Sequence, residues 1–93
     1  MDHAARTARE LQADIGRVLL TRWDPIGVGD VPEASGEYDG YIGPVHRLLA
    51  SGATENEIAQ YLAGIEAKAM GLEVLDWRRL LPVAQELRRV FQR

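Results

Sequence analysis

At residues 23–30 the chain reads Trp23-Asp24-Pro25-Ile26-Gly27-Val28-Gly29-Asp30, and the same segment runs on to Tyr41-Ile42-Gly43-Pro44. Three of the four prolines and five of the nine glycines lie between Pro25 and Pro44. Because proline fixes φ and glycine permits positive φ, this composition predicts turns and no long regular element. Pro25 also disfavours the α conformation in the residue before it, so a helix is expected to stop at Asp24. A connection of about a dozen residues inside a small domain is uncommon and is often functional.

Helix-period segments lie on both sides of this connection, with apolar residues three and four apart. They predict a first helix over residues 3–22, a second over 44–51 after an irregular turn at 38–42, a third over 55–70, and a last one from Pro82 to about 92. Thr54 and Glu57 form a capping box for the third helix, and Gly52 and Gly71 are placed to end helices. Residues 73–81 are ambiguous, with Asp76 placed to cap a short turn.

The connection itself contains apolar residues that favour an ordered loop. We expect the side chains of Ile26, Val28 and Val31 to pack beneath the loop. The ring of Trp23 is expected to fold over the edge of the core. The prediction is therefore a packed loop with a fixed shape.

Length and composition favour one small globular domain. A chain of 93 residues has room for one modest core. The sequence is 46% hydrophobic and 27% charged, which is typical of a soluble globular protein. No segment alternates polar and apolar residues as a strand would, and no internal repeat is visible. We predict that residues 1–93 form a single all-α domain, a small bundle of about four helices with a long ordered Pro/Gly-rich loop between the first two.

Several classes of protein are disfavoured by the composition. Without cysteine the chain has no disulfides, thiolate zinc sites or cysteine nucleophiles. No apolar run reaches the roughly 18–20 residues that span a bilayer. The net charge of −3 argues against a nucleic-acid binder. We expect a cytoplasmic protein that binds neither membrane nor nucleic acid.

The charge is distributed unevenly. Within residues 23–46 the only group able to carry a positive charge is His46, and the acidic residues are Asp24, Asp30, Glu33, Glu37 and Asp39. Residues 77–93 have the opposite balance. Their one acidic residue is Glu86, and their basic residues are Arg78, Arg79, Arg88, Arg89 and Arg93. Arginine pairs at these spacings are usually a solvated helix face.

Several motifs at compatible spacing resemble a family of short bacterial proteins. The matching segments are Trp23-Asp24-Pro25-Ile26-Gly27, Glu37-Tyr38-Asp39-Gly40-Tyr41, Gly52-Ala53-Thr54, Ile65-Glu66 and Met70-Gly71-Leu72. The family is marked by a Trp-Asp-Pro-Ile/Phe-Gly segment followed by a Glu-Tyr-Asp segment, and the resemblance covers residues 19–90. It implies an all-α fold and no particular reaction. In size and acidity, members resemble the immunity proteins encoded beside bacterial toxins, which is an analogy of class only.

The sequence lacks the inventory of an enzyme. Ser35 and Ser51 stand in no Gly-x-Ser-x-Gly turn. Gly27-Val28-Gly29 lacks the third glycine of a dinucleotide loop and the Lys-Ser/Thr of a phosphate loop. We expect a protein that is not an enzyme and uses no cofactor.

An alternative hypothesis is a metal- or small-molecule-binding accessory protein that uses Asp24, Asp39 and His46. Carboxylates and one imidazole suit a hard or borderline cation. The spacing matches no calcium loop. The competing interpretation is that Asp24 and Asp39 cap backbone N–H groups.

The acidic residues of the Pro/Gly-rich loop that joins the first two predicted helices support the leading hypothesis, a non-enzymatic protein-interaction module. Carboxylates on a stiff segment beside aromatic rings speed encounter with a basic protein and anchor it. Toxin immunity is the most concrete form of this hypothesis. Basic partners include nucleases, whose own substrate is a polyanion, and an acidic loop is suited to neutralise a nuclease toxin. The predicted contact residues are Asp24, Asp30, Glu33, Glu37, Tyr38, Asp39 and Tyr41.

Two further interpretations stay open. The loop could be acidic for solubility alone, with its aromatic residues serving only as core packing. A homo-oligomer built through the apolar faces of the first and last helices is a third hypothesis.

Overall fold

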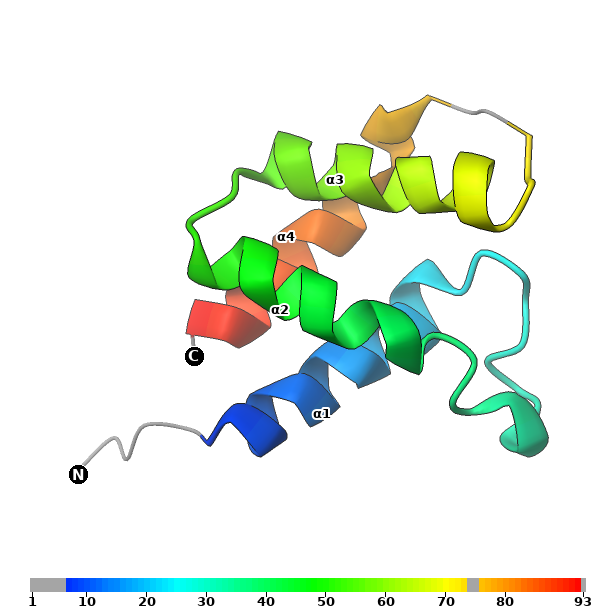
Figure 1. Ribbon diagram of the computed structural model, residues 1–93, viewed down its shortest axis with the longest axis horizontal. Helices are drawn as coiled ribbons and strands as arrows, with labels where there is room; N and C mark the ends of the chain where they lie inside the picture. The colour runs from blue at the N-terminus through cyan, green and yellow to red at the C-terminus, as the bar shows by residue number, and fades with distance from the viewer. Residues whose placement is uncertain (1–6, 74–75, 93) are drawn as a thin grey trace.

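The computed structural model describes residues 7–73 and 76–92 of the chain. These residues form four α-helices and no strand, which confirms the predicted all-α class (Figure 1). The helices are α1 (Ala8–Val18), α2 (Ile42–Ala50), α3 (Glu55–Gly64) and α4 (Leu81–Gln92). Short 3₁₀ turns occupy Pro32–Ala34, Asp39–Tyr41 and Trp77–Leu80.

Helix α1 begins later than predicted. Thr7 has an extended backbone, and its hydroxyl accepts a hydrogen bond from the Glu10 N–H while the Glu10 carboxylate accepts one from the Thr7 N–H. This capping box fixes the first helical residue at Ala8. The prediction of one continuous helix from residue 3 is therefore wrong at Thr7, and its residues 3–6 lie outside the described part of the chain.

Both α1 and α3 widen into a π-helical turn at their C-terminal ends. These turns are Leu19–Trp23 and Ile65–Ala69. The Asp24 N–H bonds to the Leu19 carbonyl at 2.9 Å, and the Met70 N–H bonds to the Ile65 carbonyl at 3.0 Å. Such turns shift the helix face that points inward.

The predicted helix signals elsewhere are confirmed. Thr54 and Glu57 form the capping box of α3, and Gly52 follows α2 with φ of +83°, where glycine has no steric penalty. Asp76 caps the 3₁₀ turn before α4. Pro44 lies in the first turn of α2, where a missing N–H costs no hydrogen bond.

Helix α4 packs against all three other helices and lies behind α2 in Figure 1. The most deeply buried side chains come from every helix or its π extension; they are Ile15, Leu19, Val45, Ile58, Leu62, Leu87 and Val90. The apolar faces of α1 and α4 are thus covered within one chain. Ala69, near the end of the predicted third helix, is exposed and lies in the π turn Ile65–Ala69. Over residues 7–73 and 76–92, no helix is long and apolar enough to cross a bilayer.

Candidate functional site

The connection between α1 and α2, residues 24–41, is called the acidic loop below. It leaves the C-terminal end of α1 and lies at the same end of the bundle as the C-terminal end of α3 (Figure 1). Apart from two 3₁₀ turns of three residues each, it has no regular structure. This agrees with the prediction of no element longer than a turn.

Asp24 organises the first half of the acidic loop. Its backbone is left-handed, with φ of 38°, a conformation that Asp tolerates better than most residues. One carboxylate oxygen, Oδ1, accepts hydrogen bonds from the Val28 N–H and the Tyr38 hydroxyl, each at 2.8 Å. The other, Oδ2, accepts one from the Gly29 N–H at 3.0 Å. The Tyr38 oxygen in turn accepts from the Ile26 N–H at 3.1 Å.

This network sets the ionisation of both side chains. Burial raises the pKa of Asp24, but the hydrogen bonds from Tyr38 and from the N–H groups of Val28, Gly29 and Gly27 outweigh it, so the pKa lies below its ordinary value. Burial raises the pKa of Tyr38 to about 12, and the Asp24 carboxylate adds to the increase. At neutral pH the pair is therefore a carboxylate held by a neutral phenol.

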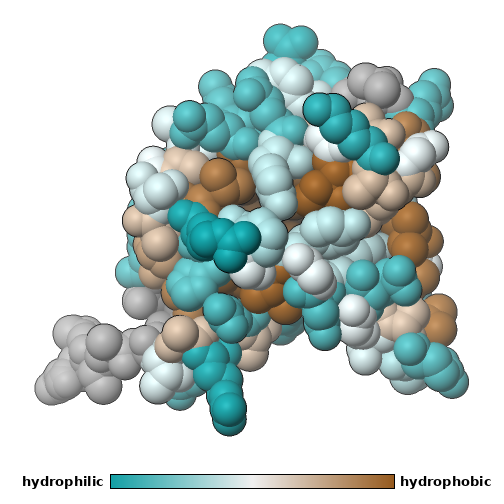
Figure 2. All heavy atoms as spheres, viewed as in Figure 1, coloured by the Kyte–Doolittle hydropathy of each residue, from teal (hydrophilic) through white to brown (hydrophobic). Residues whose placement is uncertain are grey.

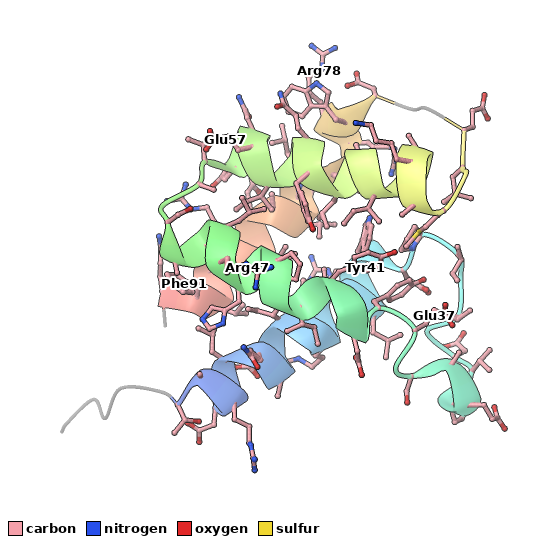
Figure 3. All side chains as sticks on the ribbon, viewed as in Figure 1. Glu37, Tyr41, Arg47, Glu57, Arg78 and Phe91 are labelled. Carbon is pink, nitrogen blue, oxygen red and sulfur yellow. The ribbon has the colours of Figure 1, made fainter. Side chains whose placement is uncertain are left out.

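The aromatic residues of the predicted site face inward. Tyr38 is 2% exposed, and its ring centroid lies 5.4 Å from that of Trp23. Tyr41 is half-buried, stands edge-on to Trp23 at 5.9 Å and lies where the loop meets α2 (Figure 3). Trp23 itself is buried. These rings tie the loop to the core, and Tyr38 shows almost no surface to solvent.

The other predicted carboxylates are exposed. They are Asp30, Glu33, Glu37 and Asp39. Of the predicted contact residues, the structure brings Asp24 and Tyr38 together as supports inside the loop, whereas these four carboxylates stand on its outer surface.

Two apolar loop residues differ from the prediction. Ile26 and Val31 were predicted to pack underneath, but their side chains are 42% and 43% exposed. Backbone hydrogen bonds from the Gly27 N–H to the Asp24 carbonyl and from the Val31 N–H to the Val28 carbonyl close two successive turns. Of the three residues predicted to pack beneath the loop, Val28 alone packs against the core. Hydrophobic residues accordingly reach the surface at the edge of the molecule where the acidic loop lies (Figure 2).

The structure does not bring the alternative metal ligands together. The His46 Nδ1 lies 3.1 Å from the Gln12 Nε2, and the His46 ring stands edge-on to Phe91. The Asp24 carboxylate instead accepts hydrogen bonds within the acidic loop, including one from Tyr38. In the part of the chain that the structure describes, no three His, Asp or Glu side chains are close enough to hold a metal ion.

A buried charge next to the loop was missed by the sequence analysis. Glu66, in the π turn that follows α3, is 4% exposed. Its Oε2 accepts a hydrogen bond from the Trp23 indole N–H at 2.8 Å, and its Oε1 pairs with Arg79. A sequence signal existed, because Glu66 follows the buried Leu62 by four residues and so lies on the apolar stripe of the helix.

The two arginines before α4 have different surroundings. Arg79 pairs with the buried Glu66, so it is not simply part of a solvated face. Arg78 pairs with the exposed Asp76 and projects from the edge of the molecule (Figure 3).

Comparison of the chain with protein-family models, with curated proteins and with solved structures finds no match. The family resemblance based on the Trp-Asp-Pro motif stays a prediction.

Proposed function

We propose that this protein is a non-enzymatic interaction module that binds a basic protein partner through its acidic loop, with neutralisation of a toxin as its most concrete form. The observation that carries the proposal is the composition of the loop surface. Ile26 and Val31 are the two exposed large hydrophobic side chains in the described residues, and both lie in the loop with the exposed carboxylates.

This combination suits protein recognition better than solubility alone. Carboxylates kept only for solubility need no fixed backbone and no neighbouring apolar groups. Here the Asp24 network holds the backbone, so less ordering entropy is lost on binding. Exposed apolar groups ringed by charge are typical of the centre and rim of a protein interface.

The two kinds of residue predict two kinds of kinetic effect. Charges on an interface rim act mainly on the association rate and its salt dependence. Apolar anchors act mainly on the dissociation rate. The exposed carboxylates are expected to govern the first, and Ile26 and Val31 the second.

The test begins with the protein as bait in a low-salt lysate of its source organism, followed by kinetics with the purified captured partner. The double variant Glu33→Gln/Glu37→Gln should slow association by roughly tenfold at low salt and flatten its salt dependence. The control Glu55→Gln/Glu86→Gln removes the same charge from α3 and α4 and should change the rate little. Ile26→Ser/Val31→Ser should speed dissociation. Equal association rates for the loop variant and the control would reject the proposal.

A further inference from the structure

A cavity of about 240 Å³ lies between the start of the acidic loop, the C-terminal end of α3 and the 3₁₀ turn before α4. Its walls are Trp23, Pro25, Glu66, Leu72, Glu73 and Arg79. None of the four exposed carboxylates of the acidic loop lines this cavity, although Pro25 of the loop does.

The wall of the cavity contains the buried carboxylate of Glu66. Among the residues that the structure describes, that carboxylate accepts one hydrogen bond on each oxygen, from Trp23 and from Arg79. An ionised carboxylate has about four acceptor positions, so it retains capacity for a further donor. A charge in the interior of a small domain is costly, and an apolar side chain of similar volume often serves stability as well or better. Glu66 lines the cavity while holding Trp23 and Arg79, so its remaining acceptor positions make it a candidate for recognition of a donor.

The backbone around the cavity is irregular in three places. Trp23 and Glu66 each lie in a π-helical turn, and Asp24 is the one residue other than glycine with positive φ in the described ranges. Both kinds of irregularity cluster at functional sites in proteins. Here they meet at one point, because the Trp23 indole donates its hydrogen bond to Glu66.

Size and charge narrow the class of ligand. The volume of the cavity is below the roughly 300 Å³ at which pockets for drug-sized ligands begin. It is nevertheless about the volume that eight water molecules take up in the liquid, at roughly 30 Å³ each. It therefore suits a group the size of one side chain. Glu66 and Glu73 outnumber Arg79, so an anion would meet net repulsion, whereas a cation on an apolar stem would place the stem against Trp23 and Leu72.

We propose that this cavity binds an alkylammonium group, supplied by a lysine side chain of the protein partner. The lysine as source rests on the proposed function, whereas the ammonium chemistry rests on the cavity itself. The ammonium would donate to Glu66 and Glu73.

The first experiment titrates the ¹⁵N-labelled protein with n-butylammonium chloride at constant ionic strength. The Trp23 indole N–H is the reporter, and the Trp77 indole, at the start of the turn before α4, is the internal control. We expect a saturable shift of the Trp23 signal with millimolar affinity. Sodium butyrate and n-butanol should give none. The proposal is overturned if the Trp23 signal does not saturate by about 0.1 M, or if butyrate and n-butanol move it equally.

Variants locate the binding. Glu73 is exposed, so Glu73→Gln should fold normally and raise the dissociation constant for n-butylammonium about three- to tenfold, as expected for one lost partly screened charge contact. Glu55→Gln is the matched control and should leave it unchanged. An unchanged constant in Glu73→Gln would overturn the proposed site. Glu66→Gln is the stronger perturbation but also removes the Arg79 pair, so the test does not depend on it.

A capped hexalysine peptide separates this proposal from the proposed function. The loop variant Glu33→Gln/Glu37→Gln should weaken hexalysine binding and leave n-butylammonium binding intact, whereas Glu73→Gln should weaken both. If the loop variant alone weakens hexalysine binding, the cavity proposal fails and the loop proposal stands. If Glu73→Gln alone does so, the cavity is supported and the loop proposal fails.

Discussion

Tyr38→Phe removes one hydroxyl group and with it two hydrogen bonds of the acidic loop. The hydroxyl donates to the ionised Asp24 carboxylate and accepts from the Ile26 N–H. A bond to a charged group contributes about 1.5–3 kcal/mol and a neutral one about 0.5–1.5 kcal/mol. Because the Ile26 N–H can turn to water, the lower part of the second range applies. We expect the free energy of unfolding to fall by about 2–3 kcal/mol at pH 7.

The pH dependence tests the protonation state of the same hydroxyl, because burial, with a smaller contribution from Asp24, disfavours its ionised form in the folded protein. The folded pKa of Tyr38 is about 12 against an ordinary value of 10.0. A raised folded pKa means that stability from the neutral hydroxyl is fully present below pH 10 and is lost as the pH rises from 10 towards 12. At 1.36 kcal/mol per pKa unit, the loss approaches about 2.7 kcal/mol. This loss is the cost of ionising the buried hydroxyl in the folded protein, and it is similar in size to the loss expected for Tyr38→Phe at pH 7.

The assay is urea unfolding followed by tryptophan fluorescence and circular dichroism, from pH 7 to pH 12. The quantity of interest is the stability difference between wild type and Tyr38→Phe, because the titration of other groups is common to both proteins. The difference should be constant to about pH 9.5 and shrink towards zero by pH 12. Tyr61→Phe is the control, since burial also raises the pKa of Tyr61 and no hydrogen bond of the described residues joins it to Asp24. A difference below about 1 kcal/mol at pH 7, or one that does not change with pH, would refute the role given to the Asp24–Tyr38 pair.

Three smaller perturbations test the same framework by urea unfolding. A Cβ at Gly29 would lie 2.9 Å from the Asp24 carboxylate and 3.1 Å from the Leu20 carbonyl, so Gly29→Ala should lower the free energy of unfolding by about 1–3 kcal/mol. A Cβ at Gly40 would meet no atom within 4 Å, so the control Gly40→Ala should lower it by at most about 1 kcal/mol. Asp24→Asn should be less stable than wild type at pH 7; because the folded pKa of Asp24 is lowered, the difference is present above about pH 3.8 and should shrink as the pH falls further. Thr54→Ala removes the cap of α3 and should cost about 1 kcal/mol, and recovery of most of that loss in Thr54→Ser would attribute it to the hydroxyl.

The helices could be predicted from the sequence because their signals are local. Thr54 and Glu57 mark the start of α3 within four residues, Gly52 has the positive φ that glycine favours, and Pro82 lies in the first turn of α4, where proline loses no hydrogen bond. An equally local signal, Thr7 and Glu10, marks the start of α1, whereas the predicted start at residue 3 followed apolar periodicity alone. A capping box decides a helix start more sharply than periodicity does, because it supplies partners to otherwise unpaired N–H groups.

The loop and the cavity depend on contacts between distant residues, so the sequence predicted them only in part. That Asp24 orders the turn was expected, but its bond to Tyr38 spans 14 positions and could not be read from spacing. Ile26 and Val31 lie in two successive backbone turns, and the Asp24 carboxylate accepts hydrogen bonds from Val28 and Gly29 where the two turns meet. The link from Trp23 to Glu66 spans 43 positions. Glu66 follows the buried Leu62 by four residues on one helix face, and a charged residue at such a position is rarely buried without a partner.

Trp23 connects the two surfaces for which functions are proposed. Its ring packs against Tyr38 and Tyr41, which hold the acidic loop, while its indole N–H holds the carboxylate that lines the cavity. A group bound to Glu66 would therefore act on the same side chain that anchors the loop. A partner that used the cavity and the loop together would bind more tightly than through either contact alone, because the second contact would form within one complex. Replacing Trp23 would loosen both surfaces at once, which is why the tests above change Glu73, Glu33 and Glu37 at the periphery and leave the shared ring in place.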